Sequence, residues 1–226
     1  FTGIDDTGQE GLELAFQKSL AGLPGAKRVI KDRAGHIVED VESIRLPQDG
    51  QPLMLSIDSK IQYLAYRELR DAVIANRAKA GSIVVLDVRT GEVVALASLP
   101  DYNPNNRVGL KPAQIRNRPV VDMFEPGSTL KPFTVAAALE AGKITPSTVI
   151  STAPGSLKVG GRTIHDAHPQ GAITVAQVIQ KSSNVGTAKI ALSLPAEAMW
   201  DMFSDVGFGA TPQSGLPGES SGKVRP

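Results

Sequence analysis

The chain has 226 residues, of which 41% are hydrophobic, and its formal net charge is +1. This length allows one or two domains with a sizeable core, and the small net charge argues against a general nucleic-acid binder. The sequence contains no cysteine, which excludes disulfides and cysteine-rich metal sites.

Residues 1–50 predict a small α+β appendage without a catalytic constellation. Apolar side chains recur at helical spacing between residues 9 and 21, which predicts one short amphipathic helix. Residues 27–31 and 37–46 have the composition of β-strands, and the Asp-Arg-Ala-Gly segment between them predicts a hairpin turn. Segment 47–52, which contains Pro and Gly, then breaks the pattern, so we place a domain boundary there.

A longer α+β region follows this boundary. Leu53–Ile57 predicts a strand, and Asp58 can cap the long amphipathic helix that begins after it. Two apolar β runs, Gly81–Leu86 and Glu92–Leu99, predict a second hairpin. Residues 100–121 are rich in Pro, Asn and Arg, which predicts an ordered loop that leads to the next segment.

Ser128 and Lys131 lie three residues apart where the sequence predicts the start of a helix. Pro132 has no N–H, and its ring would clash with the carbonyl group of Ser128, so the helix is expected to begin at Ser128 or Thr129 and to end at Gly142. This spacing places both side chains on one helix face, where a neutral lysine amine could take the proton of a nucleophilic serine. The N–H groups at the helix start could contribute to an oxyanion hole.

The Ser-x-x-Lys pattern is weak when it is taken alone, because it is expected about once by chance in a chain of this length. A second copy, Ser220 to Lys223, lies in a segment rich in Gly, Ser and Pro, and we interpret it as coincidental. The alternative interpretation of the first copy is a helix-capping serine at Ser128, followed by an exposed lysine.

The segment after this helix predicts one hairpin and three further helices. Residues 156–164 predict two short strands joined at a Gly-Gly turn. Thr174 and Gln177 form a capping-box pattern ahead of a helix that is expected to end near residue 181. Val185–Leu194 predicts the next helix, and Pro195 can open the last one, which is expected to end near residue 207.

A second motif, Ser182-Ser183-Asn184, lies in the turn between two of these helices. Ser-x-x-Lys together with Ser-x-Asn and Lys-Thr-Gly is the signature of class A β-lactamases and penicillin-binding proteins. The chain also resembles the transpeptidase domain of class B penicillin-binding proteins over nearly its whole length, and their cell-division branch matches best. The strings that carry the resemblance are RNRPVVDMFEPGSTLKPF (116–133), ITVAQVIQKSSNVGTAKIA (173–191), SIDSKIQ (56–62), GSIVVLDVRTGEVVALASLPDYNPN (81–105) and GQEGLELAFQKSLAGLPG (8–25).

The resemblance implies a role for each of four residues. Ser128 would attack the penultimate D-alanine of a peptidoglycan stem peptide, and Lys131 would accept the serine proton. Ser182 would hydrogen-bond Lys131 and relay a proton to the leaving amine, while Asn184 would hold the substrate amide and help to position Lys131. An amine of a neighbouring stem peptide would then take the acyl group, and β-lactams would acylate the same serine. No cofactor and no metal are expected.

The resemblance also implies an α+β fold of the β-lactamase and transpeptidase (penicilloyl-serine transferase) type, with an antiparallel sheet between helical layers. Residues 1–50 would be the C-terminal part of a non-catalytic pedestal domain, and residues 51–226 the N-terminal part of the transpeptidase domain. No Lys-Thr-Gly follows Asn184, and the similar Arg89-Thr90-Gly91 is assigned to a hairpin turn. We therefore expect a chain truncated before that strand, with an incomplete sheet, and we expect the isolated chain to need the missing part for activity.

Partners and location follow from the same resemblance. The expected partners are peptidoglycan stem peptides, β-lactams, and division proteins that include a membrane glycosyltransferase, but not nucleic acid. The sequence has no initiator methionine, no signal peptide and no run of about 18 apolar residues. We therefore expect a piece of a longer protein, whose N-terminal anchor would hold it in the cytoplasmic membrane with the catalytic domain facing the periplasm.

Several alternatives stay open from the sequence. The elongation branch of the same class is one, although the arginine-rich segment that precedes Ser128 argues against it. Hydrolysis of β-lactams is a second, and a β-lactam-binding or scaffold module without turnover is a third. His165, Asp166 and His168 could suggest a metal site or a histidine base, but we interpret them as residues that shape the loop before Ser182.

Overall fold

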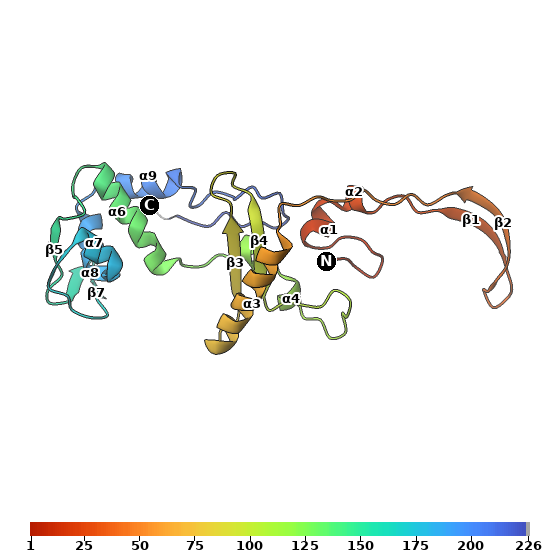
Figure 1. Ribbon diagram of the computed structural model, residues 1–226, viewed down its shortest axis with the longest axis horizontal. Coiled ribbons are helices and arrows are strands. Elements are labelled where there is room, and N and C mark those ends of the chain that lie inside the picture. The colour runs from red at the N-terminus through yellow and green to blue at the C-terminus, as the bar shows by residue number, and fades with distance from the viewer. Residues whose placement is uncertain (225–226) are drawn as a thin grey trace. The chain divides into compact units, whose positions relative to one another are not determined.

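The computed structural model describes residues 1–224, which form two compact units. The first unit comprises residues 1–122 and 213–220, and the second comprises residues 123–212 and the segment that begins at Ser221. The domain boundary expected near residue 50 stays a prediction. Both units combine helices with antiparallel strand pairs (Figure 1), which confirms the expected α+β class. No helix among residues 1–224 is both long and apolar enough to cross a membrane.

The first unit contains two strand pairs and several helices. Its elements are α1 (Gly11–Ala15), α2 (Gln17–Leu20), β1 (Ala26–Lys31), β2 (Ile37–Arg45), α3 (Ser59–Ala75), β3 (Gly81–Leu86), β4 (Val93–Leu99), α4 (Pro112–Ile115) and α5 (Arg118–Val121). The antiparallel pairs β1–β2 and β3–β4 confirm both predicted hairpins. The single helix expected over residues 9–21 is wrong, because the chain forms α1 and α2, which are separated at Phe16. Neither short helix buries a residue, so no tertiary packing stabilises a longer one.

Helix α3 packs against the β3–β4 pair and buries Ala65 and Leu69 there (Figure 1). Asp58 caps α3 as predicted, because its carboxylate accepts hydrogen bonds from the N–H groups of Lys60 and Ile61. Gly81 permits this packing: a Cβ atom at this position would lie 2.9 Å from Leu69 Cδ1. The absence of a side chain on Gly81 therefore lets strand and helix approach closely.

Two further expectations for the first unit are wrong. Residues 53–57 form no strand, because isolated bonds hold this segment instead of a ladder: Ser56 Oγ donates to Val93 O at 2.7 Å. The region 100–121, expected to be a loop, contains α4 and α5, and each has a proline in its first turn. Proline is favoured there because its fixed φ suits a helix start, so Pro112 and Pro119 were signals that could have predicted both helices.

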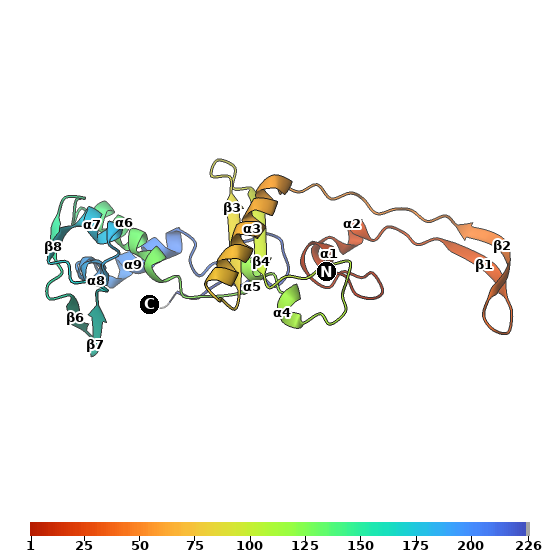
Figure 2. The same ribbon diagram turned by 60° about the horizontal axis from the view of Figure 1, so that its bottom comes forward.

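The second unit is a helical cluster with two short strand pairs. Its elements are the 3₁₀ turn η1 (Gly127–Leu130), α6 (Lys131–Glu140), β5 (Val149–Ser151), β6 (Ser156–Val159), β7 (Arg162–His165), β8 (Ala172–Thr174), α7 (Val175–Gln180), α8 (Asn184–Leu192) and α9 (Ala196–Asp205). Figure 2 shows α6, α7, α8 and α9 gathered together, with the β6–β7 hairpin beside them. Val135, Ala138, Val175, Val178 and Ile190 form the centre of their shared core.

Local signals predicted most of this unit. The hairpin β6–β7, the capping box of Thr174 and Gln177, and helices α7 to α9 are confirmed, with ends that differ by a few residues. The pair β5–β8 was missed. Each of these strands has three residues, so alternation of apolar and polar side chains has no room to appear, and their pairing depends on a contact across more than twenty residues.

Candidate active site

Ser128 lies in the 3₁₀ turn η1, directly before α6. The helix was expected to begin at Ser128 or Thr129, and the structure shows a tight turn there before the α-helix begins at Lys131. The reason is Pro132, which has no N–H to donate to Ser128 O, so the N–H of Lys131 donates to that carbonyl instead. Gly127, at φ +60, supplies the left-handed residue at which the turn begins.

The structure brings together three of the four residues expected from the sequence. Lys131 Nζ lies 3.0 Å from Ser128 Oγ and 2.8 Å from Ser182 Oγ. The same nitrogen donates to the backbone carbonyl of Ser182 at 2.6 Å. The first contact is local, between residues three apart, whereas the other two join α6 to the turn between α7 and α8. Two hydroxyl groups therefore meet at one amine.

Burial lowers the pKa of the Lys131 amine, and the negative charge of Asp166 opposes part of this effect. Removal from water destabilises the ammonium form, so a larger fraction of the amine is neutral at a given pH than in an exposed lysine. A neutral amine has a lone pair and can accept a proton. Lys131 thus has the electrostatic environment of a general base.

The turn between α7 and α8 has a strained backbone at Ser182, whose φ is +54. A residue with a Cβ atom adopts this left-handed conformation at a cost of about 1–2 kcal/mol. Here it allows both the hydroxyl and the carbonyl oxygen of Ser182 to meet Lys131 Nζ. Strain of this kind persists where neighbouring contacts hold it, and it is common at functional sites.

Asn184, which was expected to hold the substrate amide and to help to position Lys131, contacts β7. It is the first residue of α8, and its Nδ2 donates to the backbone carbonyl of His165 at 2.8 Å. This bond ties the start of α8 to the end of β7. The expected roles of Asn184 in holding a substrate amide and in helping to position Lys131 stay predictions.

Sequence reasoning assigned no role to Ser183, the middle residue of the motif, which is only 2% exposed. Its hydroxyl oxygen accepts the N–H of Gly186 at 2.8 Å and so caps α8, while its proton is donated to Asp166. A serine immediately before a predicted helix was the signal that could have found this cap. The interpretation of Asp166 as a residue that shapes the loop agrees with these contacts. Among residues 1–224 no group of three His, Cys, Asp or Glu side chains could hold a metal ion.

The two other sequences that resemble the family motifs have structural roles. Arg89-Thr90-Gly91 lies in the β3–β4 turn, where the N–H of Arg89 donates to Asp87 Oδ1 at 2.8 Å. The hydroxyl of Ser220 donates to Val121 O at 2.8 Å and holds the segment 213–220 to α5. Neither arrangement offers a nucleophile with a base.

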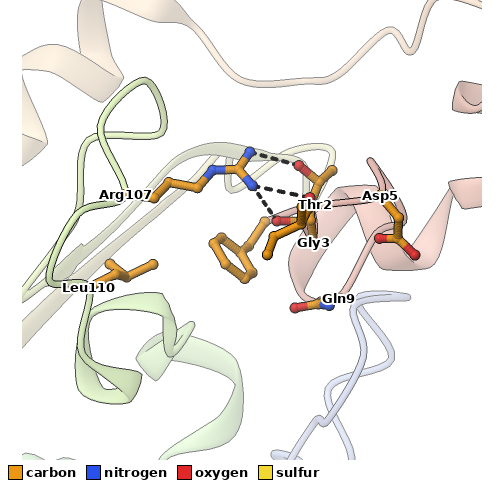
Figure 3. Close-up of a pocket in the computed structure, with 8 residues that line it drawn as sticks. Thr2, Gly3, Asp5, Gln9, Arg107 and Leu110 are labelled. Carbon is orange, nitrogen blue, oxygen red and sulfur yellow. Dashed lines mark hydrogen bonds between the residues drawn. The ribbon is translucent and has the colours of Figure 1, made fainter. Parts of the chain in front are cut away.

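The first unit also contains a hollow of about 590 Å³, formed by the N-terminal segment and a loop before α4 (Figure 3). Arg107 crosses it and donates to the carbonyl of Thr2 at 2.6 Å, to its hydroxyl at 2.8 Å and to the carbonyl of Gly3 at 3.3 Å. Its guanidinium group also lies 5.2 Å from the centre of the Phe1 ring. Because these contacts satisfy Arg107 within the chain, they explain its position without a ligand.

Comparisons with known proteins agree with this geometry. Residues 81–226 match the transpeptidase domain family of penicillin-binding proteins. The chain is 47% identical over 227 residues to the probable peptidoglycan D,D-transpeptidase PenA of Neisseria gonorrhoeae, covering 100% of this chain and 39% of that protein. It is 46% identical over 222 residues to the peptidoglycan D,D-transpeptidase FtsI of Escherichia coli, covering 98% of this chain and 37% of that protein.

A solved structure of penicillin-binding protein 3 from Mycobacterium tuberculosis matches all of this chain and 47% of its own, with 33% identity and a TM-score of 0.82. A peptidoglycan glycosyltransferase structure from Burkholderia ambifaria matches 76% of this chain and 51% of its own, with 47% identity and a TM-score of 0.68. The chain spans about two fifths of the length of the curated relatives it matches. These matches, together with the lysine that joins two serine hydroxyls, show that the chain belongs to the penicillin-binding protein transpeptidase family.

Proposed function

We propose that the chain is part of a peptidoglycan D,D-transpeptidase that cross-links stem peptides through an acyl-enzyme on Ser128 during septal cell-wall synthesis. The observation that carries this proposal is the position of Lys131 Nζ, 3.0 Å from Ser128 Oγ and 2.8 Å from Ser182 Oγ. Relatives named peptidoglycan D,D-transpeptidase support the reaction. The resemblance to the cell-division branch supports the septal role.

Counting protons at Lys131 supports its role as the base. A neutral amine has two N–H donors and one lone pair. The carbonyl oxygen of Ser182 can only accept, so it takes one N–H at 2.6 Å. One N–H and the lone pair then remain for the two hydroxyl groups. When the lone pair faces Ser128, its hydroxyl proton points at the base and its oxygen is free to attack.

The reaction then follows from these contacts. Ser128 Oγ forms a bond to the carbonyl carbon of the penultimate D-alanine as Lys131 takes its proton, and backbone N–H groups of the turn η1, where the helix starts, stabilise the oxyanion. The bond to the terminal D-alanine breaks, and its nitrogen receives a proton through Ser182. An amine of a neighbouring stem peptide next attacks the ester carbon and gives one proton to Lys131. The ester bond breaks and Ser128 Oγ takes this proton from Lys131, which leaves a new amide cross-link and a neutral lysine.

The proposal extends to ligands, partners and location. β-Lactams present a strained amide that Ser128 would open by the same first step, and Asn184 would bind the substrate or β-lactam amide. The whole protein would be anchored in the cytoplasmic membrane with this site facing the periplasm. It would act with division proteins that include a membrane glycosyltransferase. The support for these points is the resemblance to cell-division transpeptidases.

A labelling experiment with fluorescent penicillin tests the proposed function. We expect the intact protein to form a stable adduct that mass spectrometry places on Ser128. Ser128→Ala should abolish the adduct, whereas the control Ser147→Ala, at an exposed serine of the same unit, should retain it. An adduct on another residue, or labelling that persists in Ser128→Ala, would refute the assignment. Rapid turnover of the penicillin would favour hydrolysis over transpeptidation.

A further inference from the structure

Asp166, directly after β7, makes several contacts with the Ser182-Ser183-Asn184 turn. Its Oδ2 accepts the hydroxyl proton of Ser183 at 2.9 Å, and its Oδ1 lies 3.1 Å from the same hydroxyl. Oδ1 also accepts the backbone N–H of Val185 at 2.9 Å. One carboxylate therefore binds the turn on both sides of Asn184.

We propose that Asp166 is a positioning residue of the acyl-transfer site, which holds this turn in the conformation that places Ser182 against Lys131. The inference rests on the proposed function of Ser128 and Lys131. The hydrogen bonds of Asp166 go to Ser183 and Val185 and not to Ser128 or Lys131, so it acts through the turn.

Ser183 transmits this effect because its hydroxyl group is held both as a hydrogen-bond donor and as an acceptor. It donates its single proton to Asp166 and accepts the N–H of Gly186 at 2.8 Å. Hydrogen bonds to an ionised acceptor are stronger than those between neutral groups. The side chain is almost fully buried, so water cannot replace Asp166 without opening the turn. The carboxylate thus fixes the residue that follows Ser182.

The strained backbone of Ser182 explains why such a clamp is needed. Its left-handed conformation costs about 1–2 kcal/mol, and it would relax if the neighbouring residue were free to move. Both contacts of Ser182 with Lys131 Nζ, at 2.8 Å and 2.6 Å, depend on that conformation. Release of Ser183 is therefore expected to separate Ser182 from the base.

Asp166 also acts on Lys131 through its charge. The carboxylate raises the pKa of the lysine amine and opposes the larger lowering caused by burial. The other ionisable groups on the segment before η1 and on α6, β7, α7 and its cap, and α8 are Glu125, Glu140, Arg162, His165, Lys181 and Lys189. Lys181 Nζ donates to Gln170 Oε1 at 2.7 Å, and Lys189 Nζ donates to Ser151 O at 2.6 Å. Loss of the negative charge at Asp166 should therefore favour the neutral amine, even where the turn stays in place.

Two substitutions separate the effect of Asp166 on the position of the turn from the effect of its charge on Lys131. Asp166→Asn keeps an oxygen that can accept from Val185 and Ser183 but removes the charge. Asp166→Ala removes both. The matched control is Asp201→Asn at an exposed carboxylate on α9 of the same unit. Three quantities are measured: the amide hydrogen exchange of Val185, the pKa of Lys131 by NMR, and the rate of acylation by fluorescent penicillin as a function of pH.

For Asp166→Ala we expect faster exchange at Val185 and an acylation rate lower by about 100-fold at the optimum of the pH profile, since small displacements of reacting groups have effects of this size. For Asp166→Asn we expect a smaller loss of rate and an acidic limb of the pH profile that moves to lower pH. Asp201→Asn should match the wild type in all three measurements.

A wild-type rate and profile in both Asp166 variants, with unchanged exchange at Val185, would overturn the inference. If Asp166→Ala fails to fold, the Asn variant still decides, because a general loss of stability would not move its pH profile. If the wild type forms no adduct, the proposed function fails. The exchange and the lysine pKa would then still test the clamp, because neither measurement needs acylation.

Discussion

Adding one methyl group at Gly186 is predicted to destabilise the second unit. A Cβ atom there would lie 2.7 Å from Val178 Cγ2 and 3.0 Å from Ser183 Oγ. Val178 is 0% exposed, so its side chain cannot move aside into solvent. Overpacking of this kind costs about 1–3 kcal/mol, and a displaced cap at Ser183 adds about 1 kcal/mol. The better helix propensity of alanine returns up to about 1 kcal/mol, so we expect Gly186→Ala to cost about 1–3 kcal/mol.

Urea unfolding followed by Trp200 fluorescence measures this cost, because the only tryptophan of the chain lies on α9 in the same unit. Gly186→Ala should lower the midpoint of the transition at constant slope. It should also slow the proposed acylation, since Ser183 N–H donates to Val178 O at 2.9 Å and a displaced Val178 would move the turn that carries Ser182.

A double-mutant cycle with Val178→Ala tests the steric reason. Val178→Ala alone should cost about 1–3 kcal/mol through the cavity it leaves. In the double variant the added methyl group would occupy part of that space. The free-energy cost of the double variant should therefore be smaller than the sum of the two single costs by about 0.5–3 kcal/mol. Strictly additive costs, or an unchanged midpoint in Gly186→Ala, would refute the reasoning.

Two further predictions concern the acidic stability of the first unit and the role of the second serine. Hydrogen bonds from Arg116 and Arg118 lower the pKa of Asp122 below its unfolded value, so its stabilisation should be complete above about pH 4 and lost as pH falls through the lowered pKa. Asp122→Asn should therefore lower the stability of the first unit by about 1 kcal/mol near neutral pH and remove the loss of stability at acidic pH. Hydrogen exchange of the α5 amides measures both effects, and an unchanged pH dependence would contradict the ion pairs. Ser182→Ala removes the hydroxyl 2.8 Å from Lys131 Nζ and should slow acylation by at least about 100-fold, whereas a wild-type rate would exclude Ser182 from proton transfer.

Local patterns in the sequence were sufficient for most elements of this chain. The cap at Asp58, the capping box at Thr174 and Gln177, and the turns of the hairpins depend on hydrogen bonds between residues a few positions apart. Such interactions can be read from a short window of sequence. The predictions failed for the segment 53–57 and for the pair β5–β8, where the outcome depends on a partner distant in the chain.

The same distinction applies to the site. The sequence alone determined that Ser128 and Lys131 share one face of a helix start, because their spacing and Pro132 leave little freedom. The resemblance pointed to Ser182, but only the tertiary structure decided its left-handed backbone, the buried hydroxyl of Ser183 and the hydrogen bond of that hydroxyl to Asp166, 17 residues away. It also decided the lowered pKa of Lys131. Burial and long-range contacts arise from packing between segments, and the order of residues does not encode them locally.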